Sequence, residues 1–286
     1  MQAELNRFKN HLKIIGYGQS TQSMISSYTR EFTNYYSSKK AQEITREDII
    51  NYYEYLSTRP NKRRTGGLSG ASLKHHIYAI RTFLNYLEQI GKLSENPISG
   101  LNFPKHTNKT REILTIQEIQ ELYNKTENSL EKAVLGIFYG CGLRRTEGQA
   151  LNIKDINFRE DLLYVREGKG KKRRVIPLNK KVKQDIENYI YFERFSKTET
   201  CTEQSRSDKA LIVNKTGQRM RGGTYNTIIK NLVEKAGIKK EITLHNLRHT
   251  IATQLLNNGM SIEYVRDFLG HKHLEATQIY THVINE

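Results

Sequence analysis

The sequence predicts two domains: an all-helical domain, followed by a mainly helical domain with a small β-sheet (α+β). With 286 residues, of which 36% are hydrophobic, the chain is long enough for two ordinary domains with packed cores. Apolar residues in the first hundred positions recur every three to four residues, as in amphipathic helices, and no strand pattern occurs there. Short runs with strand character occur only in the second half.

We predict four or five helices in the first domain, four of which can be delimited in the sequence. Thr45 is placed to cap the third helix, and Gly91 is placed to end the fourth. Apolar residues at positions 77, 80, 84 and 87 of the fourth helix have the spacing of a buried face. The helices cover residues 2–15, 20–36, 46–56 and 71–90.

Basic residues gather around the start of the fourth helix. They are either solvated surface charge or contacts for a polyanion, which backbone N–H groups at a helix start also attract. We favour the second interpretation. The residues are Lys62, Arg63, Arg64, Lys74, His75, His76 and Arg81.

The stretch that follows has the composition of an interdomain linker. It is polar, lacks periodicity and contains Pro97 and Pro104, two of the four prolines of the chain. We place the first domain at residues 1–100, the linker at 101–111 and the second domain at 112–286.

The second domain is predicted to be mainly helical around one β-hairpin. Thr115 and Glu118 form a capping box for its first helix, and Ser129 is placed to cap a second, largely apolar and central helix that ends at Gly140. Strands are expected at residues 162–165, 173–178 and 210–213, with a polar loop at 196–209. Further helices are expected at residues 179–195 and after capping residues Thr224, Thr243 and Ser261.

The chain is strongly basic, with a net charge of +16 and a pI of about 9.7. Such an excess favours nucleic acid as a partner, then an anionic membrane surface, with a solvated basic face as the plain alternative. Cys141 and Cys201 lack metal-site spacing, and we expect both to stay reduced in a cytoplasmic protein. The N-terminus lacks a signal-peptide core, and the longest apolar run is too short to span a bilayer.

Several residues suited to phosphate chemistry follow one another along the second domain. Arg144 in GLRRTE begins a helical turn, where a cation needs an anion beside it; Glu147 or a bound phosphate would serve. A glycine-rich hairpin turn carries Lys169, and its basic side chains are either solvated or contact a phosphate backbone. His245 and Arg248, three residues apart on a helix, face the same way. His271 follows a Leu-Gly pair, and Tyr280 lies near the chain end.

In this order and context the residues resemble the tyrosine recombinase (phage integrase) family, most closely its Xer-type members. The resemblance covers nearly the whole chain and includes the string LHNLRHTIATQLL, LGH and TQIYTHV. It implies site-specific DNA recombination through a 3′-phosphotyrosyl intermediate, without a metal or nucleotide cofactor. It also implies a SAM-like helical core-binding domain that forms a C-shaped DNA clamp with the catalytic domain.

The resemblance assigns the family's catalytic roles to six residues. Two arginines would stabilise the phosphate charge, Tyr280 would be the nucleophile, His245 the general base and Lys169 the general acid, while His271 would bind phosphate or orient the nucleophile. Glu147 would support Arg144, and His249 would pack behind the site. The catalytic set is Arg144, Lys169, His245, Arg248, His271 and Tyr280, and the expected DNA contacts are Lys62, Arg63, Arg64, Lys74, Lys171, Lys172 and Arg173.

The expected partner is a double-stranded recombination site, bound by a homotetramer on two duplexes in the cytoplasm, at the nucleoid. Two alternatives use the same residues: a DNA-binding protein that no longer exchanges strands, and a relaxing topoisomerase. Dimer resolution and mobile-element integration share one chemistry, so the sequence does not separate them.

Three departures from the family pattern stand out, one of which is the loop at 196–209, which looks like an insertion. Gly148 replaces an apolar residue, which predicts looser packing around Arg144. Six residues follow Tyr280, where relatives carry a further helix, so coupling between subunits is not predicted.

Overall fold

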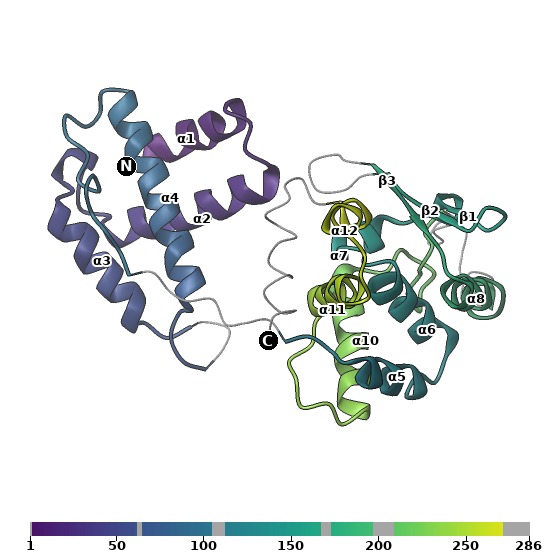
Figure 1. Ribbon diagram of the computed structural model, residues 1–286. Coiled ribbons are helices and arrows are strands. Elements are labelled where there is room, and N and C mark those ends of the chain that lie inside the picture. The colour runs from purple at the N-terminus through teal and green to yellow at the C-terminus, as the bar shows by residue number, and fades with distance from the viewer. Residues whose placement is uncertain (1, 62–64, 105–111, 167–172, 197–208, 271–286) are drawn as a thin grey trace. The chain divides into compact units, whose positions relative to one another are not determined.

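The structure is a computed structural model that describes residues 2–61, 65–104, 112–166, 173–196 and 209–270 (Figure 1). The chain divides into two compact units, Met1–Thr110 and Arg111–Glu286, each with its own hydrophobic core. None of the described helices is long and apolar enough to cross a membrane.

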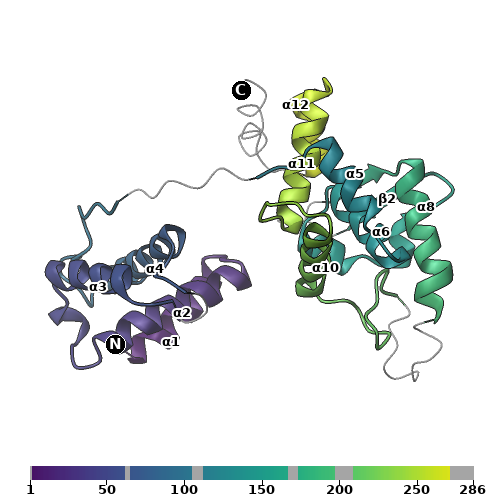
Figure 2. The same ribbon diagram turned by 90° about the horizontal axis from the view of Figure 1, so that it is seen from below.

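The first unit is all-helical, as predicted. α4 packs against α2 and α3, and α1 packs against α2 (Figures 1 and 2). Aromatic rings fill the core, with Phe8 against Phe83 and Phe32 against Tyr52, each pair with centroids 5.1 Å apart. Its elements are α1 (Gln2–Ile14), α2 (Gln19–Tyr35), η1 (Ala41–Glu43), α3 (Arg46–Thr58) and α4 (Gly70–Gln89).

The capping and burial predictions for this unit have mixed outcomes. Thr45 caps α3 as predicted, because its side chain accepts a hydrogen bond from the backbone N–H of Asp48. The assignment of His76 to the basic surface was wrong. His76 lies on the buried stripe of α4 and is 1% exposed, and burial, then the charges of Arg59 and His75, lowers its pKa to about 4.

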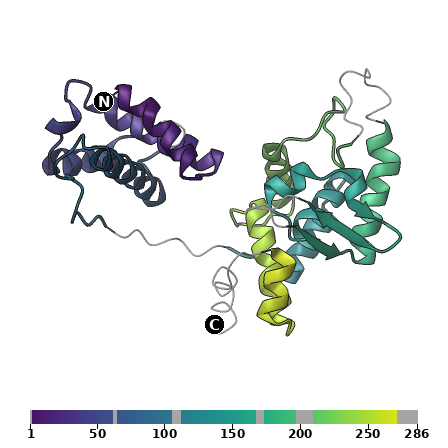
Figure 3. The same cartoon turned by 90° about the horizontal axis from the view of Figure 1, so that it is seen from above.

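The second unit is mainly helical, with a three-stranded antiparallel sheet at one side (Figure 3). Its strands are β1 (Ile156–Asn157), β2 (Leu162–Val165) and β3 (Arg174–Pro177), in that order across the sheet. Its helices include α5 (Ile116–Asn124), α6 (Ser129–Leu135), α7 (Arg145–Ala150), α8 (Lys180–Asn188), α10 (Gly222–Lys235), α11 (Leu244–Asn257) and α12 (Ile262–Leu269). Short helical turns are η2 (Gly136–Gly140), η3 (Ile153–Asp155) and η4 (Tyr189–Arg194).

The apolar helix predicted to be central is buried as expected. α6 continues without a break into the π-helical turn η2, and α8 and α11 pack against that turn. Gly140 permits the close approach of α8, since a Cβ there would lie 2.5 Å from a methyl carbon of Val182. α12 packs against both α11 and β3, which brings its C-terminal end beside the start of that strand.

Three local predictions for this unit were wrong. Asn128, not Ser129, caps α6, because the Ser129 hydroxyl donates to Glu193 instead. α10 begins at Gly222, before Thr224, since the Gly222 N–H is accepted by a side chain of α7, Gln149. Residues 210–213 are buried but form only isolated bridges, Asn152 with Ala210 and Val213 with Arg219, because their neighbours lie on different segments.

Candidate active site

Arg144 immediately precedes α7 and directs its guanidinium towards the end of α12. Its Nη2 donates to the Gly270 carbonyl at 3.1 Å, and its Nη1 donates to Glu147 Oε1 at 2.7 Å and to the Leu269 carbonyl at 3.4 Å. Glu147 Oε2 accepts the backbone N–H of Arg144 at 2.8 Å. The anion predicted to balance this arginine is therefore Glu147, and the side chain of Arg144 keeps 21% of its surface exposed.

Arg248 lies deeper, on α11, and only 1% of it is exposed. Its Nη1 donates to the Gly142 carbonyl at 2.5 Å, and its Nη2 donates to the Leu269 carbonyl at 2.6 Å. Gly142 and Gly270 both have left-handed backbone conformations, with φ of 58° and 65°, which glycine adopts without steric cost. These two turns present main-chain carbonyls to the two arginines, and Leu269 serves both.

Glu147 is the buried anion between the arginines. Burial by itself raises the pKa of its carboxyl group, but hydrogen bonds and charge from Arg174, and then hydrogen bonds from Arg144, lower that pKa to about 2. Arg174 donates to both carboxylate oxygens of Glu147, from Nη1 to Oε1 at 3.0 Å and from Nη2 to Oε2 at 2.9 Å. Glu147 is therefore ionised at neutral pH, and it supports Arg144 as the sequence predicted.

His245 is exposed in the first turn of α11, and His249 lies buried one turn later. Their Nε2 atoms are 3.1 Å apart, so one imidazole donates to the other. A neutral His245 that donates through Nε2 keeps Nδ1 as a proton acceptor, whereas the opposite tautomer makes Nδ1 a donor. The placement of His249 behind His245 agrees with its predicted packing role.

Arg144 and His245 line one open depression of about 400 Å³. The starts of α7 and α11 form its walls, so backbone N–H groups lie beside the two side chains. A guanidinium, an imidazole and helix starts together suit an anion such as a phosphodiester. The lining residues are Leu143, Arg144, Arg145, Thr146, Asn226, Thr243, Leu244 and His245.

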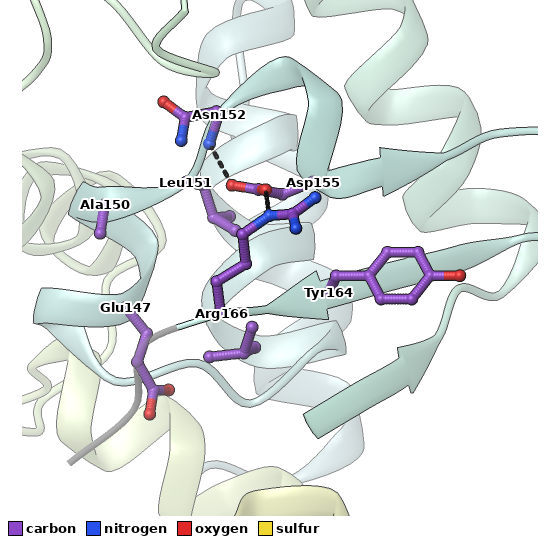
Figure 4. A pocket seen from close by; sticks show the side chains of 8 residues that line it. Glu147, Ala150, Leu151, Asn152, Asp155, Tyr164 and Arg166 are labelled. Atoms are coloured by element: carbon purple, nitrogen blue, oxygen red, sulfur yellow. Dashed lines mark hydrogen bonds and ion pairs between the residues drawn. The ribbon is translucent and has the colours of Figure 1, made fainter. Parts of the chain in front are cut away.

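A second pocket, of about 220 Å³, lies beside β2 and extends to Glu147 (Figure 4). Arg166 projects across it and binds Asp155, whose carboxylate also accepts the backbone N–H of Asn152 at 2.9 Å (Figure 4). The polar side chains of this pocket bind one another and contain no catalytic candidate.

Several predicted site residues fall outside the described part of the chain. Among the predicted DNA contacts, Lys74 is exposed on α4 and Arg173 is exposed before β3. Arg174, which directly follows Arg173, turns inward instead. The predicted residues outside the described ranges are Lys62, Arg63, Arg64, Lys169, Lys171, Lys172, His271 and Tyr280.

Sequence reasoning missed the role of Arg174. Alternation along β3 was the available signal, since Arg174 shares a face with the buried residues Ile176 and Leu178. The prediction of loose packing at Gly148 was also wrong: the ring of Phe138 fills that space, and a Cβ on Gly148 would lie 2.4 Å from it.

Residues 112–286 match the phage integrase family. The chain belongs to this family. Tyrosine recombinase XerD of Oceanobacillus iheyensis is 33% identical over 270 residues, which are 91% of this chain and 87% of that protein. Tyrosine recombinase XerD of Listeria innocua is 30% identical over 285 residues, 96% of this chain and 92% of that protein.

Solved structures of this family have the same fold. XerA recombinase, at 29% identity, aligns with a TM-score of 0.54 over 97% of this chain and 93% of its own. A lambda integrase dimer bound to a COC′ core site, at 16% identity, aligns with a TM-score of 0.73 over 98% of this chain and 94% of its own. The predicted Xer-like membership and α+β fold are confirmed, and the chain is a tyrosine recombinase, an enzyme of site-specific DNA recombination.

No group of three or more His, Cys, Asp or Glu side chains is placed to hold a metal ion within the described ranges. The prediction of metal-independent chemistry stays a prediction.

Proposed function

We propose that this recombinase cleaves and rejoins DNA through a 3′-phosphotyrosyl intermediate, with Tyr280 as the nucleophile. The observation that carries the proposal is that Arg144 and Arg248 both donate to the Leu269 carbonyl and both lie beside the carboxylate of Glu147. Arg144 and His245 open onto one depression that suits a phosphodiester.

In the first step, the Tyr280 phenol oxygen attacks phosphorus and the bond to the 5′-oxygen breaks. His245 takes the phenol proton, and Lys169 gives a proton to the 5′-oxygen that leaves. Arg144 stabilises the charge on the non-bridging oxygens, which a fixed guanidinium does without reorganisation. Arg248 is the second guanidinium of the proposed catalytic set and adds to this stabilisation of the phosphate charge. His271 binds the phosphate or orients the nucleophile.

In the second step, the 5′-hydroxyl of another strand attacks the phosphotyrosyl phosphorus and releases Tyr280. The proton then returns to the phenol. One phosphodiester bond is lost and one is formed, so the exchange needs no nucleotide cofactor. The same groups serve both directions of this transesterification.

The assembly and location belong to the same proposal. Residues 1–100 form the core DNA-binding domain, 101–111 the linker and 112–286 the catalytic domain. We assign Lys62, Arg63, Arg64, Lys74, Lys171, Lys172 and Arg173 to DNA contact, with four copies of the chain on two duplexes, in the cytoplasm at the nucleoid. Support comes from the exposed positions of Lys74 and Arg173 and from relatives solved on DNA, such as XerH on a palindromic difH substrate.

Covalent trapping tests the proposal. A DNA site selected from a genomic pool is nicked to make a suicide substrate, and the products are separated on a denaturing gel. We expect a protein–DNA adduct with the wild type and none with Tyr280→Phe, while both bind the site equally. Tight wild-type binding without an adduct would favour a DNA-binding protein that does not exchange strands.

A further inference from the structure

Arg174 is the first residue of β3 and faces the protein interior. The next residue, Val175, is 48% exposed, whereas only 8% of the Arg174 side chain is exposed. Strand alternation therefore places the arginine on the same face as Ile176, which is fully buried. Its neighbour Arg173 is exposed, so two adjacent basic residues have opposite environments.

Each of the three guanidinium nitrogens of Arg174 has an acceptor inside the protein. Nη1 and Nη2 donate to the two oxygens of Glu147, at 3.0 and 2.9 Å, and Nε donates to the Phe268 carbonyl at 2.9 Å. The side chain also lies close against Gly270, where an added Cβ would meet Arg174 Cδ and Nη1 at 3.0 Å. Such a bidentate, buried pair has a defined geometry, and here all three nitrogens of the guanidinium are bound to acceptors inside the protein.

We propose that Arg174 is a positioning residue for strand cleavage, and that it acts by holding Glu147 so that Arg144 stays directed at the scissile phosphate. This inference rests on the proposed function. Arg174 balances the buried carboxylate at both oxygens, whereas the side chain of Arg144 contacts only Oε1 within the described structure. Without Arg174, an unbalanced buried charge would draw the Arg144 guanidinium fully onto Glu147 and away from the substrate.

The same side chain connects two segments that carry proposed catalytic residues. Lys169 lies five positions before Arg174 in the sequence, and His271 lies three positions after Phe268. The bond from Arg174 to the Phe268 carbonyl therefore ties the strand after Lys169 to the helix before His271. Arg174 thus fixes the start of β3 and the C-terminal end of α12 relative to Glu147.

The test compares Arg174→Met with Arg166→Met. Arg166 is the control, because it directly follows β2, the strand that pairs with β3, and binds a different carboxylate, Asp155, while its side chain is 54% exposed. Single-turnover adduct formation on the suicide substrate gives the cleavage rate, and DNA titration gives Kd. We expect Arg174→Met to slow cleavage roughly 100-fold, as for a catalytic group displaced by about 1 Å, while Kd changes less than about threefold. Arg166→Met should keep its cleavage rate within about threefold of wild type.

A second substitution separates this role from loss of folding. Glu147→Gln in the Arg174→Met background removes the charge that would capture Arg144, so the double variant should cleave about tenfold faster than Arg174→Met. Arg174→Lys, which keeps the charge but not the bidentate geometry, should cleave faster than the double variant and more slowly than wild type. If Arg174→Met does not fold, the comparison of Arg174→Lys with the double variant carries the test, and Lys slower than the double variant would overturn the proposal.

The remaining outcomes are equally decisive. Wild-type cleavage by Arg174→Met, or a double variant no faster than the single one, would refute the positioning role and leave the proposed function intact. A parallel loss of DNA affinity and rate in both arginine variants would show that Arg174 contributes only general charge. No Tyr280-dependent adduct from the wild type would refute the proposed function, and this inference with it.

Discussion

Glu147→Gln should remove a pH-dependent share of the stability of the second unit. The pKa of this carboxyl falls from an ordinary 4.5 to about 2 in the folded protein. At about 1.4 kcal/mol per tenfold change in the proton-binding constant, this fall corresponds to about 3 kcal/mol of stability. Because the folded-state pKa is lowered, that stability is fully present above pH 4.5 and is lost as the pH falls through about 2.

Urea unfolding, read by pulsed hydrogen exchange and mass spectrometry on peptides of the second unit, measures this effect. The wild type should lose about 2 kcal/mol between pH 6 and pH 3 that Glu147→Gln does not lose. Glu121→Gln, which changes an exposed carboxylate on α5, should behave as the wild type. Equal pH slopes for the wild type and Glu147→Gln would show that the arginines do not hold Glu147 as an ion, and would refute the reasoning.

Three further predictions concern packing and burial in the second unit. Gly148→Ala should lower the stability by about 1–3 kcal/mol in a thermal melt, because the new Cβ would lie 2.4 Å from the Phe138 ring. This cost should exceed the gain from the higher helix propensity of alanine. A stabilised variant would contradict this packing. Thr250→Ala should cost about 1–3 kcal/mol by urea unfolding, since the buried Leu114 N–H loses its acceptor, whereas Thr250→Ser should retain most of the stability. Cys141 is 1% exposed, and burial raises the pKa of its thiol to about 12. The thiol should therefore resist iodoacetamide at pH 8 until the protein unfolds. Peptide mass spectrometry measures the labelling, and labelled Cys141 in the native chain would contradict this prediction.

The elements with strong local signals were predictable from sequence. The cap at Thr45 and the capping box at Thr115 form as predicted, because a cap depends on residues only three positions apart. The cap of α10 was not predictable in this way, since Gln149, 73 residues away, accepts the Gly222 N–H. The strand prediction for residues 210–213 failed for a different reason. A short apolar run fits a buried segment without regular structure as well as it fits a strand.

The candidate site also contains residues that local sequence predicts and residues that only packing brings together. Arg144, His245 and Arg248 were proposed from motif and spacing, and Glu147 was one of the two anions considered for Arg144. Long-range packing decided which groups bind the two arginines and Glu147. The carbonyls of Gly142, Leu269 and Gly270 and the guanidinium of Arg174 arrive from distant segments, so no local pattern could name them as partners.

The sequence by itself determined the family, the helix-rich two-domain composition and the identity of the catalytic candidates, because these depend on residue types and short spacings. Only the tertiary structure decided the environment of each charge. Two adjacent basic residues show the difference: Arg173 is exposed, whereas Arg174 is buried against Glu147. The cost of burying an ion depends on the partners that long-range packing brings to it, and those partners are set by the whole fold.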